Sequence, residues 1–426
     1  MAPRRRVKDR APQTPRQVAH QVVLRVCEDG AYADRALRGA ADAAGLEGRD
    51  RAFATQLVYG TVQRVRPLDH GIETLGGRPV RRLDPEVRAA LRLGAFQLAH
   101  LASVPAHAAV DETVELVRLA GLERAVGFTN AVMRRLANGL AELLASLPDA
   151  TVAEAALRHS YPDWVAATWW RELGRAEALA LMQAQNEHAE TAVRVNPRRL
   201  SNLSELEGAT DPDIPGALVV ERIPDAWLEQ GLVWPQSRGS QLAGLAVGAR
   251  PGERLLDVCA APGGKATQLD ADVVAVELNA GRARELRETC ARLGAANVTV
   301  VQADGLALPS QLTGFDRALV DAPCSGLGTL ASRPDLRWRA KPLPELQLGL
   351  LRAAAERVRP GGRLVYSVCT ISAAENEAVV DALGLEYDDL GVEWPRFRHP
   401  RRPEFLLTLP HRDRTSGFFV ARLRRP

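Results

Sequence analysis

From Trp234 to the C-terminus, short apolar runs alternate with segments of helical periodicity. The expected strands are residues 254–259, 273–277, 298–302, 317–320, 363–368 and 417–423. Strands separated by helix-length segments are typical of an open, mostly parallel α/β sheet. Because crossovers between parallel strands are right-handed, such a sheet binds its ligand beyond the carboxyl ends of its strands. The turns that follow these strands are therefore the expected place for chemistry.

Two of these turns contain a cysteine. Cys324 lies in the sequence DAPCSG (321–326), and Cys369 lies in YSVCT (366–370). The interval between them holds one predicted helix, 343–358, so their strands should be neighbours and their turns should converge on one pocket. Two thiols beside a cofactor turn indicate covalent chemistry on an electrophilic ring, in which one thiol adds and the other helps it to leave. The residues alone leave the two roles interchangeable.

The first turn of the predicted sheet, AAPGGK (260–265), suits close approach of a ligand. Its small residues let a ligand meet the backbone, and a helix N-terminus is expected after it to supply free amide donors. Glu277 ends the next strand, where an acid accepts hydrogen bonds from ribose hydroxyls, and Asp304 follows the third strand, within reach of an adenine amine. Both the P-loop spacing and the G-x-G-x-x-G fingerprint are missing, which disfavours a nicotinamide cofactor.

Methylation of cytosine at carbon 5 requires a nucleophilic thiol beside a cofactor. Carbon 5 is a poor nucleophile until a thiolate adds to carbon 6. The site must lower the pKa of the thiol, which is ordinarily about 8.5, or bind the thiolate electrostatically. Lys265 is a source of positive potential, and Asp321 is placed to hydrogen-bond the ring amine and nitrogen 3. Cys27 and Cys290 lie in helical patterns and are assigned to packing, while Cys259 is expected to line the cofactor turn.

The first third of the chain is predicted to be a compact helical bundle. Thr14 and Pro15 form a helix start, and Gly30 can close that helix. Apolar residues recur at helical spacing in 51–62, 85–101, 106–119 and 126–144. The segments 50–60 (DRAFATQLVYG), 104–114 (VPAHAAVDETV) and 128–132 (FTNAV) resemble the NusB-type RNA-binding helical domain over roughly residues 12–140.

The middle of the chain is mixed. Helices at 153–158 and 163–186 lead to a strand at 191–196, and the polar stretch 201–216 is predicted as loop. The pair Trp169-Trp170 is assigned to the core, because a helical context favours burial over base stacking.

Composition places the protein in the cytoplasm. Five scattered cysteines without a Cys-x-x-Cys pair suit a reducing compartment and predict neither disulfides nor zinc. We expect no secretory signal, membrane span or metal. Basic residues gather at both ends, which is common in proteins that meet nucleic acid. Only three of the 55 basic residues are lysines, so the arginine richness reflects genome composition, whereas Lys265 stands out.

The motifs together resemble the NOL1/NOP2/Sun family of S-adenosylmethionine-dependent RNA cytosine-5 methyltransferases. The matching segments are 257–265, 321–328, 333–338 (RPDLRW), 366–370, 375–377 (ENE) and 417–419 (GFF). Joined to a NusB-like N-terminus, they resemble the bacterial members that methylate a cytosine of small-subunit ribosomal RNA. The resemblance implies that Cys369 is the nucleophile, that Cys324 assists product release and that Asp321 orients the base. It also implies a cofactor site made of Cys259, Ala260, Ala261, Pro262, Gly263, Gly264, Lys265, Glu277, Asp304 and Asp321.

Three positions depart from the family pattern. Val368 stands where a threonine is usual before the nucleophile, and Glu277 replaces the commoner aspartate. Residues 235–238 (PQSR) replace a usual Gln-Asp pair before the Rossmann core, so the pattern does not predict the contacts of this entry segment.

The expected architecture is a multidomain chain. Residues 1–145 form a NusB-like all-α bundle with a disordered start at 1–12, residues 146–232 a linker and small α+β (RRM-like) subdomain, and residues 233–426 a Rossmann-like methyltransferase domain. The expected protein is a monomer that acts on small-subunit ribosomal RNA. Transfer RNA, DNA with Cys324 as the attacking thiol, and a non-catalytic RNA-binding assembly factor are the alternatives.

Overall fold

The computed structural model of the protein describes residues 13–200 and 205–426, so the predicted disorder of residues 1–12 lies outside the described residues. The chain divides into two compact units. Unit 1 runs to Met182 and includes Arg333–Arg339, and unit 2 comprises Gln183–Ser332 and Ala340–Pro426. The three-part division with boundaries at 145 and 232 stays a prediction.

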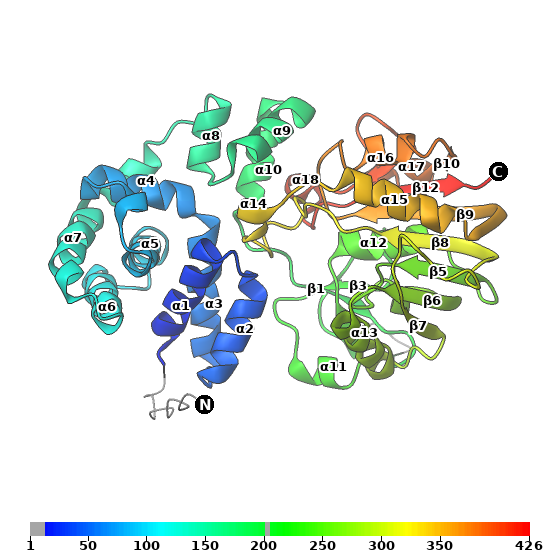
Figure 1. The fold of residues 1–426 in the computed structure, drawn as a ribbon, viewed down its shortest axis with the longest axis horizontal. Helices are drawn as coiled ribbons and strands as arrows, with labels where there is room; N and C mark the ends of the chain where they lie inside the picture. Colours follow the sequence, from blue (N-terminus) through cyan, green and yellow to red (C-terminus); the bar gives the residue numbers. More distant parts are fainter. Residues whose placement is uncertain (1–12, 201–204) are drawn as a thin grey trace, which may run out of the picture. The chain divides into compact units, whose positions relative to one another are not determined.

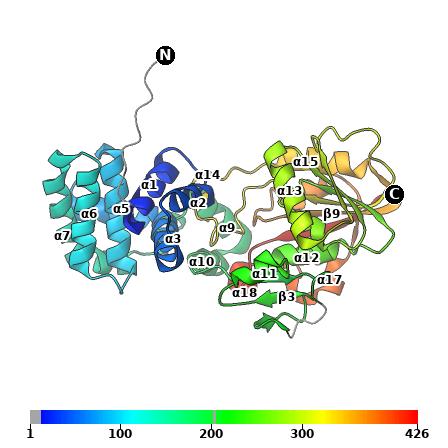
Figure 2. The same ribbon diagram turned by 90° about the horizontal axis from the view of Figure 1, so that it is seen from below.

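Unit 1 is helical, as predicted. Its helices are α1 (Pro15–Glu28), α2 (Ala33–Ala43), α3 (Gly48–Gln63), α4 (Val65–Gly76), η1 (Val80–Arg82), α5 (Pro85–His100), α6 (Ala106–Leu119), α7 (Glu123–Ala145), α8 (Val152–Arg158), α9 (Asp163–Leu173), α10 (Arg175–Ala184, which crosses the boundary) and α14 (Leu336–Arg339). The Thr14 side chain accepts a hydrogen bond from the Gln17 amide and, with Pro15, starts α1. Figure 2 shows α5, α6 and α7 side by side, and their buried leucines, valines and alanines form the core of the bundle.

The predicted helix over residues 163–186 is wrong in one respect, because it is two helices. Gly174 separates α9 from α10 with a φ of 81°, a conformation that glycine adopts without steric cost. Trp169 is fully buried, with its ring centroid 5.2 Å from that of Tyr161, which confirms its assignment to the core.

The start of unit 2 is a small antiparallel sheet of order β2-β3-β1-β4. Its elements are β1 (Ala192–Val195), β2 (Ala209–Thr210), β3 (Ala217–Val219), α11 (Asp225–Glu229) and β4 (Val233–Pro235). The predicted loop at 201–216 thus contains the short strand β2. Arg194 in β1 is buried and donates hydrogen bonds to Gln236 and Thr267, which joins this sheet to the rest of unit 2.

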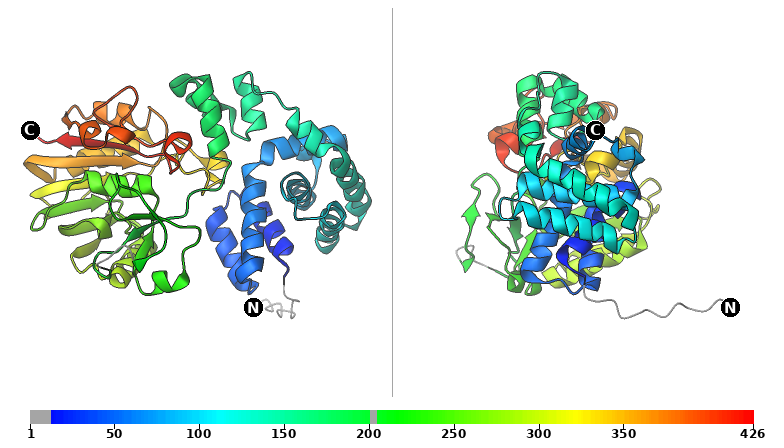
Figure 3. Two further views of the ribbon diagram at one scale, coloured as in Figure 1. Left: turned by 180° about the vertical axis from the view of Figure 1, so that it is seen from behind. Right: turned by 90° about the vertical axis from the view of Figure 1, so that its left-hand side faces the viewer.

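The main sheet has the order β10-β12-β9-β8-β5-β6-β7, with β11 paired to β12. Its strands are β5 (Arg254–Val258), β6 (Asp272–Glu277), β7 (Val298–Gln302), β8 (Phe315–Asp321), β9 (Val358–Val368), β10 (Glu386–Asp388), β11 (Leu406–Leu407) and β12 (Phe419–Arg424). The five strands from β7 to β9 are parallel (Figure 1). The C-terminal strand β12 runs antiparallel to β9 (Figure 3). The predicted α/β sheet is confirmed, and its order reverses between β5 and β8, the place where such sheets bind ligands.

The remaining helical segments flank this sheet. They are α12 (Arg238–Ala246), η3 (Ala266–Gln268), α13 (Ala280–Leu293), α15 (Pro344–Ala355), α16 (Glu377–Asp381), α17 (Leu390–Glu393), η4 (Pro395–Phe397) and α18 (Pro410–Asp413). The expected helix N-terminus after the cofactor turn is wrong, because only the 3₁₀ turn η3 follows Lys265. Too few residues separate this turn from β6 for a full helix. No helix in the described ranges is long and apolar enough to cross a membrane.

Candidate active site

A cavity of about 760 Å³ opens at the carboxyl ends of β5, β8 and β9. Its wall includes residues that follow each of these strands, namely Cys259, Asp321 and Cys369. The other side of the cavity is formed by Pro410, His411, Arg414, Thr415 and Ser416, from the loop between β11 and β12. All of the lining residues belong to unit 2.

The two predicted thiols meet here. Because β8 and β9 are neighbouring parallel strands, Cys324 and Cys369 follow them at the same edge of the sheet. The two Sγ atoms are 3.4 Å apart, within hydrogen-bonding distance for sulfur. The amide of Gly328 also donates to the Cys369 carbonyl at 3.0 Å, which joins the two turns.

The surroundings of the two thiols differ. The pKa of Cys369 lies below its ordinary value, chiefly because Cys324 donates a hydrogen bond to it and also because of the nearby Lys265 charge. The pKa of Cys324 is well above its ordinary value, because it is the donor in this pair, is buried and lies near the Glu375 carboxylate. The two thiols titrate as one coupled pair, and the direction of the shifts favours the thiolate on Cys369.

Glu375 accepts hydrogen bonds from both cysteine turns. It is fully buried. Its carboxylate accepts hydrogen bonds from the amide and hydroxyl of Ser325, the hydroxyl of Thr370, the amide of Leu343 and the side chain of Gln347. Ser325 follows Cys324 and Thr370 follows Cys369, so one carboxylate fixes the residues next to both thiols.

Lys265 and Asp321 form an ion pair inside the pocket. Lys265 Nζ lies 2.8 Å from Asp321 Oδ2 and 4.9 Å from the centroid of the Phe418 ring. Ser367 Oγ donates to the other Asp321 oxygen at 2.7 Å. The side chain of Lys265 is 9% exposed and that of Asp321 is 32% exposed, so the carboxylate is the more accessible group.

The predicted cofactor turn, Cys259 to Lys265, brings bare backbone to the cavity. Gly263 has a φ of 106°, and a Cβ added at Gly264 would lie 2.8 Å from Trp234 Nε1. Both positions therefore require glycine. Burial raises the pKa of the Cys259 thiol to about 12, so this cysteine of the cavity wall stays protonated at neutral pH.

Asp257 is a site residue that our sequence reasoning missed. It is fully buried in β5 and lines the cavity, and neither of its carboxylate oxygens has a hydrogen-bond partner among the described residues. Burial and the nearby Asp321 charge raise its pKa well above the ordinary value. An aspartate inside the apolar run of a predicted strand is the sequence signal that could have identified it.

Glu277 and Asp304 are not among the residues that line the cavity. Glu277 is 4% exposed, and its Oε1 accepts a hydrogen bond from the Asn279 amide while Oε2 has none within the described part of the chain. Asp304 is exposed and caps the Leu306 amide at 2.9 Å.

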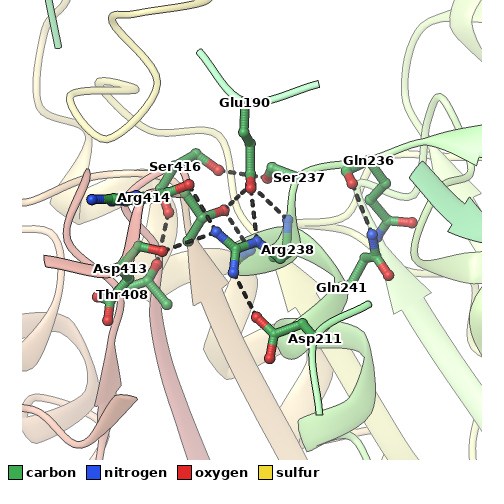
Figure 4. A network of polar contacts seen from close by, with 12 residues as sticks. Glu190, Asp211, Gln236, Ser237, Arg238, Gln241, Thr408, Asp413, Arg414 and Ser416 are labelled. Atoms are coloured by element: carbon green, nitrogen blue, oxygen red, sulfur yellow. Dashed lines mark hydrogen bonds and ion pairs between the residues drawn. The ribbon is translucent and has the colours of Figure 1, made fainter. Parts of the chain in front are cut away.

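The structure shows what surrounds two of the positions that depart from the family pattern, Val368 and Arg238. Val368 is fully buried in β9 opposite Phe419 of β12, so it packs in the core. Arg238 is the centre of a polar network that Figure 4 shows. Its guanidinium binds Glu190 at 2.7 Å and Asp211 at 2.5 Å, so a charged network occupies the entry segment.

Comparisons with known proteins agree with these motifs. The family model described as "16S rRNA methyltransferase RsmB/F" matches residues 245–424, and the NusB family model matches residues 13–138. The probable ribosomal RNA small subunit methyltransferase B of Synechocystis sp. is 33% identical over 96% of this chain and 99% of its own. The ribosomal RNA small subunit methyltransferase B of Thermus thermophilus is 36% identical, over 97% of this chain and 98% of its own.

A solved structure supports the same fold. That of PH0851 covers 98% of this chain and 100% of its own, with a TM-score of 0.77 and 24% identity. The sequence relatives show that the chain belongs to the RsmB/F family of 16S rRNA methyltransferases, with a NusB-family domain over residues 13–138.

Proposed function

We propose that this protein transfers a methyl group from S-adenosylmethionine to carbon 5 of a cytosine in small-subunit ribosomal RNA, through a covalent bond between Cys369 and the ring. The observation that carries the proposal is the pair of thiols 3.4 Å apart, of which Cys369 has the lowered pKa. Addition to a pyrimidine ring needs a thiolate, and its later departure needs a base, two roles that such an asymmetric pair can divide between its members.

The pocket suits the proposed cofactor. S-adenosylmethionine supplies an electrophilic methyl group on a positively charged sulfur. The buried oxygens of Asp257, which have no hydrogen-bond partner among the described residues, offer acceptors for its ammonium group. Glu277 Oε2 makes no hydrogen bond there and lies 3.7 Å from Arg282 Nη2, and it offers an acceptor for a ribose hydroxyl. Gly263 and Gly264 let the turn pack closely against the side chains of Leu286 and Trp234, which fixes the backbone of the turn. Asp304 is the proposed partner of the adenine amine.

In the proposed addition step, the Cys369 thiolate forms a bond to carbon 6 of the cytosine. Asp321 accepts a hydrogen bond from the ring amine, and Lys265 offsets the negative charge that develops on the ring. The electron pair released toward carbon 5 would form the new bond to the methyl group, while the bond from that methyl to the sulfonium sulfur would break and leave a neutral thioether. The Lys265–Asp321 pair is pre-positioned, so it needs no rearrangement as this charge appears.

In the proposed release step, Cys324 acts as the base. Once Cys369 is bonded to carbon, its thiolate no longer raises the pKa of Cys324, so the Cys324 proton passes to solvent. The Cys324 thiolate then takes the proton from carbon 5, the ring double bond re-forms, and Cys369 leaves as a thiolate. The pair returns to its starting protonation state, and the proton lost by the RNA has reached solvent.

The thiol roles are tested by mixing each variant with 16S ribosomal RNA and cofactor and resolving the products on a denaturing gel. Cys324→Ser should accumulate a covalent protein–RNA adduct, since a serine hydroxyl is a poor base, whereas Cys369→Ser should form none. The opposite pattern would assign the attack to Cys324 and overturn the proposed roles.

The substrate is inferred from the relatives, which are named ribosomal RNA small subunit methyltransferases. Bisulfite sequencing of RNA from a deletion strain should reveal one cytosine of small-subunit ribosomal RNA that loses its methyl group. An unchanged ribosomal RNA with a lost methyl group in transfer RNA would contradict the substrate, and no change in either would contradict the catalytic role.

A further inference from the structure

The loop wall of the pocket contains a residue in an unfavourable backbone conformation. Arg414 ends α18 with φ 52° and ψ 37°, in the left-handed region that side chains other than glycine rarely adopt. Such a residue persists only where its surroundings hold it, and these positions concentrate at functional sites. Arg414 lines the cavity and is exposed to solvent.

Arg238 holds this conformation in place. One of its terminal nitrogens, Nη2, donates to the carbonyls of Asp413 and Arg414, at 2.9 and 2.8 Å. The rest of the Arg238 guanidinium is bound to Glu190 and Asp211, whose side chains are 9% and 3% exposed. A buried network thus connects the small sheet to the backbone of Arg414 (Figure 4).

Further contacts fasten the same loop on both sides of Arg414. The Asp413 carboxylate accepts from the Leu409 amide at 2.7 Å, and the Thr415 hydroxyl accepts from the Gly239 amide at 3.1 Å. Thr408 Oγ1 donates to the Ser416 carbonyl at 2.7 Å. The loop is therefore a rigid support for whatever the Arg414 side chain binds.

The Arg414 guanidinium has no protein partner among the described residues. Within the described residues it makes no hydrogen bond, ion pair or ring contact, and Figure 4 shows it extending away from Arg238. Other arginines of the C-terminal region are paired, such as Arg402 with Asp381 and Arg422 with Asp388. In the pocket, Lys265 is likewise paired, with Asp321.

We propose that Arg414 binds a phosphate of the RNA strand next to the target nucleotide, and that Arg238 is the positioning residue that holds it there. A planar guanidinium with five donors matches the geometry of a phosphate oxygen pair. An RNA strand whose base enters the cavity brings a phosphate past the cavity mouth on each side of that base. This inference rests on the proposed function, since it requires RNA at this pocket.

The test compares Arg414→Gln with Arg352→Gln, which removes the same charge from an exposed position on α15 away from the cavity. Affinity for 16S ribosomal RNA is measured by filter binding at several salt concentrations. Arg414→Gln should weaken binding roughly fivefold and reduce the slope of log affinity against log salt by about 0.7, the value for one single-strand phosphate. Arg352→Gln should resemble the wild type.

Two more variants separate binding from folding. Arg414→Gly should lose RNA affinity to the same degree while raising the melting temperature, because glycine adopts the left-handed conformation without strain. Arg414→Lys should restore most of the salt slope. Arg238→Lys, whose single nitrogen cannot bridge both carbonyls and both carboxylates, should weaken RNA binding in the wild-type background and add little to Arg414→Gly.

An Arg414→Gln protein whose RNA affinity and salt slope equal those of the wild type would overturn the inference. A loss of S-adenosylmethionine affinity in calorimetry, with RNA binding intact, would also overturn it by assigning Arg414 to the cofactor carboxylate. Filter binding needs no turnover. A wild-type protein that binds RNA without methylating it would therefore contradict the proposed function while leaving Arg414 fully testable.

Discussion

The two sides of the pocket are built in different ways. On the strand side, Cys324, Cys369 and Asp321 follow adjacent parallel strands, so the sheet itself sets their separation. On the loop side, the wall from Pro410 to Ser416 owes its shape to side-chain hydrogen bonds, with Arg238 at their centre. A change on the strand side should therefore affect chemistry first, and a change on the loop side should affect structure and RNA binding first.

The largest effect on the reaction rate is expected from Lys265→Met on the strand side. This substitution removes the cation beside Asp321 and Cys369, so we expect the methyl-transfer rate to fall roughly 10²- to 10³-fold, as when one preorganised electrostatic group is lost. Stability should change little by comparison. The matched control is Lys341→Met, at an exposed lysine. Equal activity of the two variants would show that the strand side does not depend on this charge.

Glu375→Ala tests how far the two thiol turns depend on their shared carboxylate. The buried amide of Ser325 and the partly buried amide of Leu343 would lose their acceptor, and the side chain of Gln347 would lose one of its two. We expect the free energy of unfolding to fall by about 3–5 kcal/mol, because each unsatisfied buried group costs about 1–3 kcal/mol. Urea unfolding measures this, with the exposed Glu386→Ala as control. A loss of unfolding free energy below about 1 kcal/mol would mean that the two cysteine turns keep their conformation without the Glu375 carboxylate.

The pH dependence of the thiols gives a third test. The Cys369 pKa is lowered mainly by the hydrogen bond from Cys324, so Cys324→Ala should move the midpoint of Cys369 ionisation to higher pH. The rate of iodoacetamide labelling of Cys369, followed by mass spectrometry, reports the thiolate without RNA or cofactor. In the wild type the rate should rise with pH and level off above the midpoint. An unchanged midpoint in the variant would show that the hydrogen bond from Cys324 does not lower the pKa of Cys369.

The same contrast explains what could be predicted from the sequence. The strands that carry the thiols were predicted within a few residues, because apolar runs and parallel order follow from local pattern and from the handedness of crossovers. The loop wall could not be predicted, since Arg238 meets partners as distant in sequence as Arg414. Nor does spacing reveal that Glu375 accepts hydrogen bonds from both cysteine turns, as only the folded chain brings Ser325 and Thr370 together.

The smallest of these effects is expected from Arg238→Lys on the loop side. Lysine keeps the charge near Glu190 and Asp211 but loses the fork that also binds the carbonyls of Asp413 and Arg414. Asp211 retains Arg396 at 3.2 Å, which limits the loss. We expect about 1–2 kcal/mol less stability in urea unfolding, with the rate of methyl transfer at saturating RNA and cofactor nearly unchanged. A fall in that rate as large as the one for Lys265→Met would mean that the loop wall contributes directly to the chemistry.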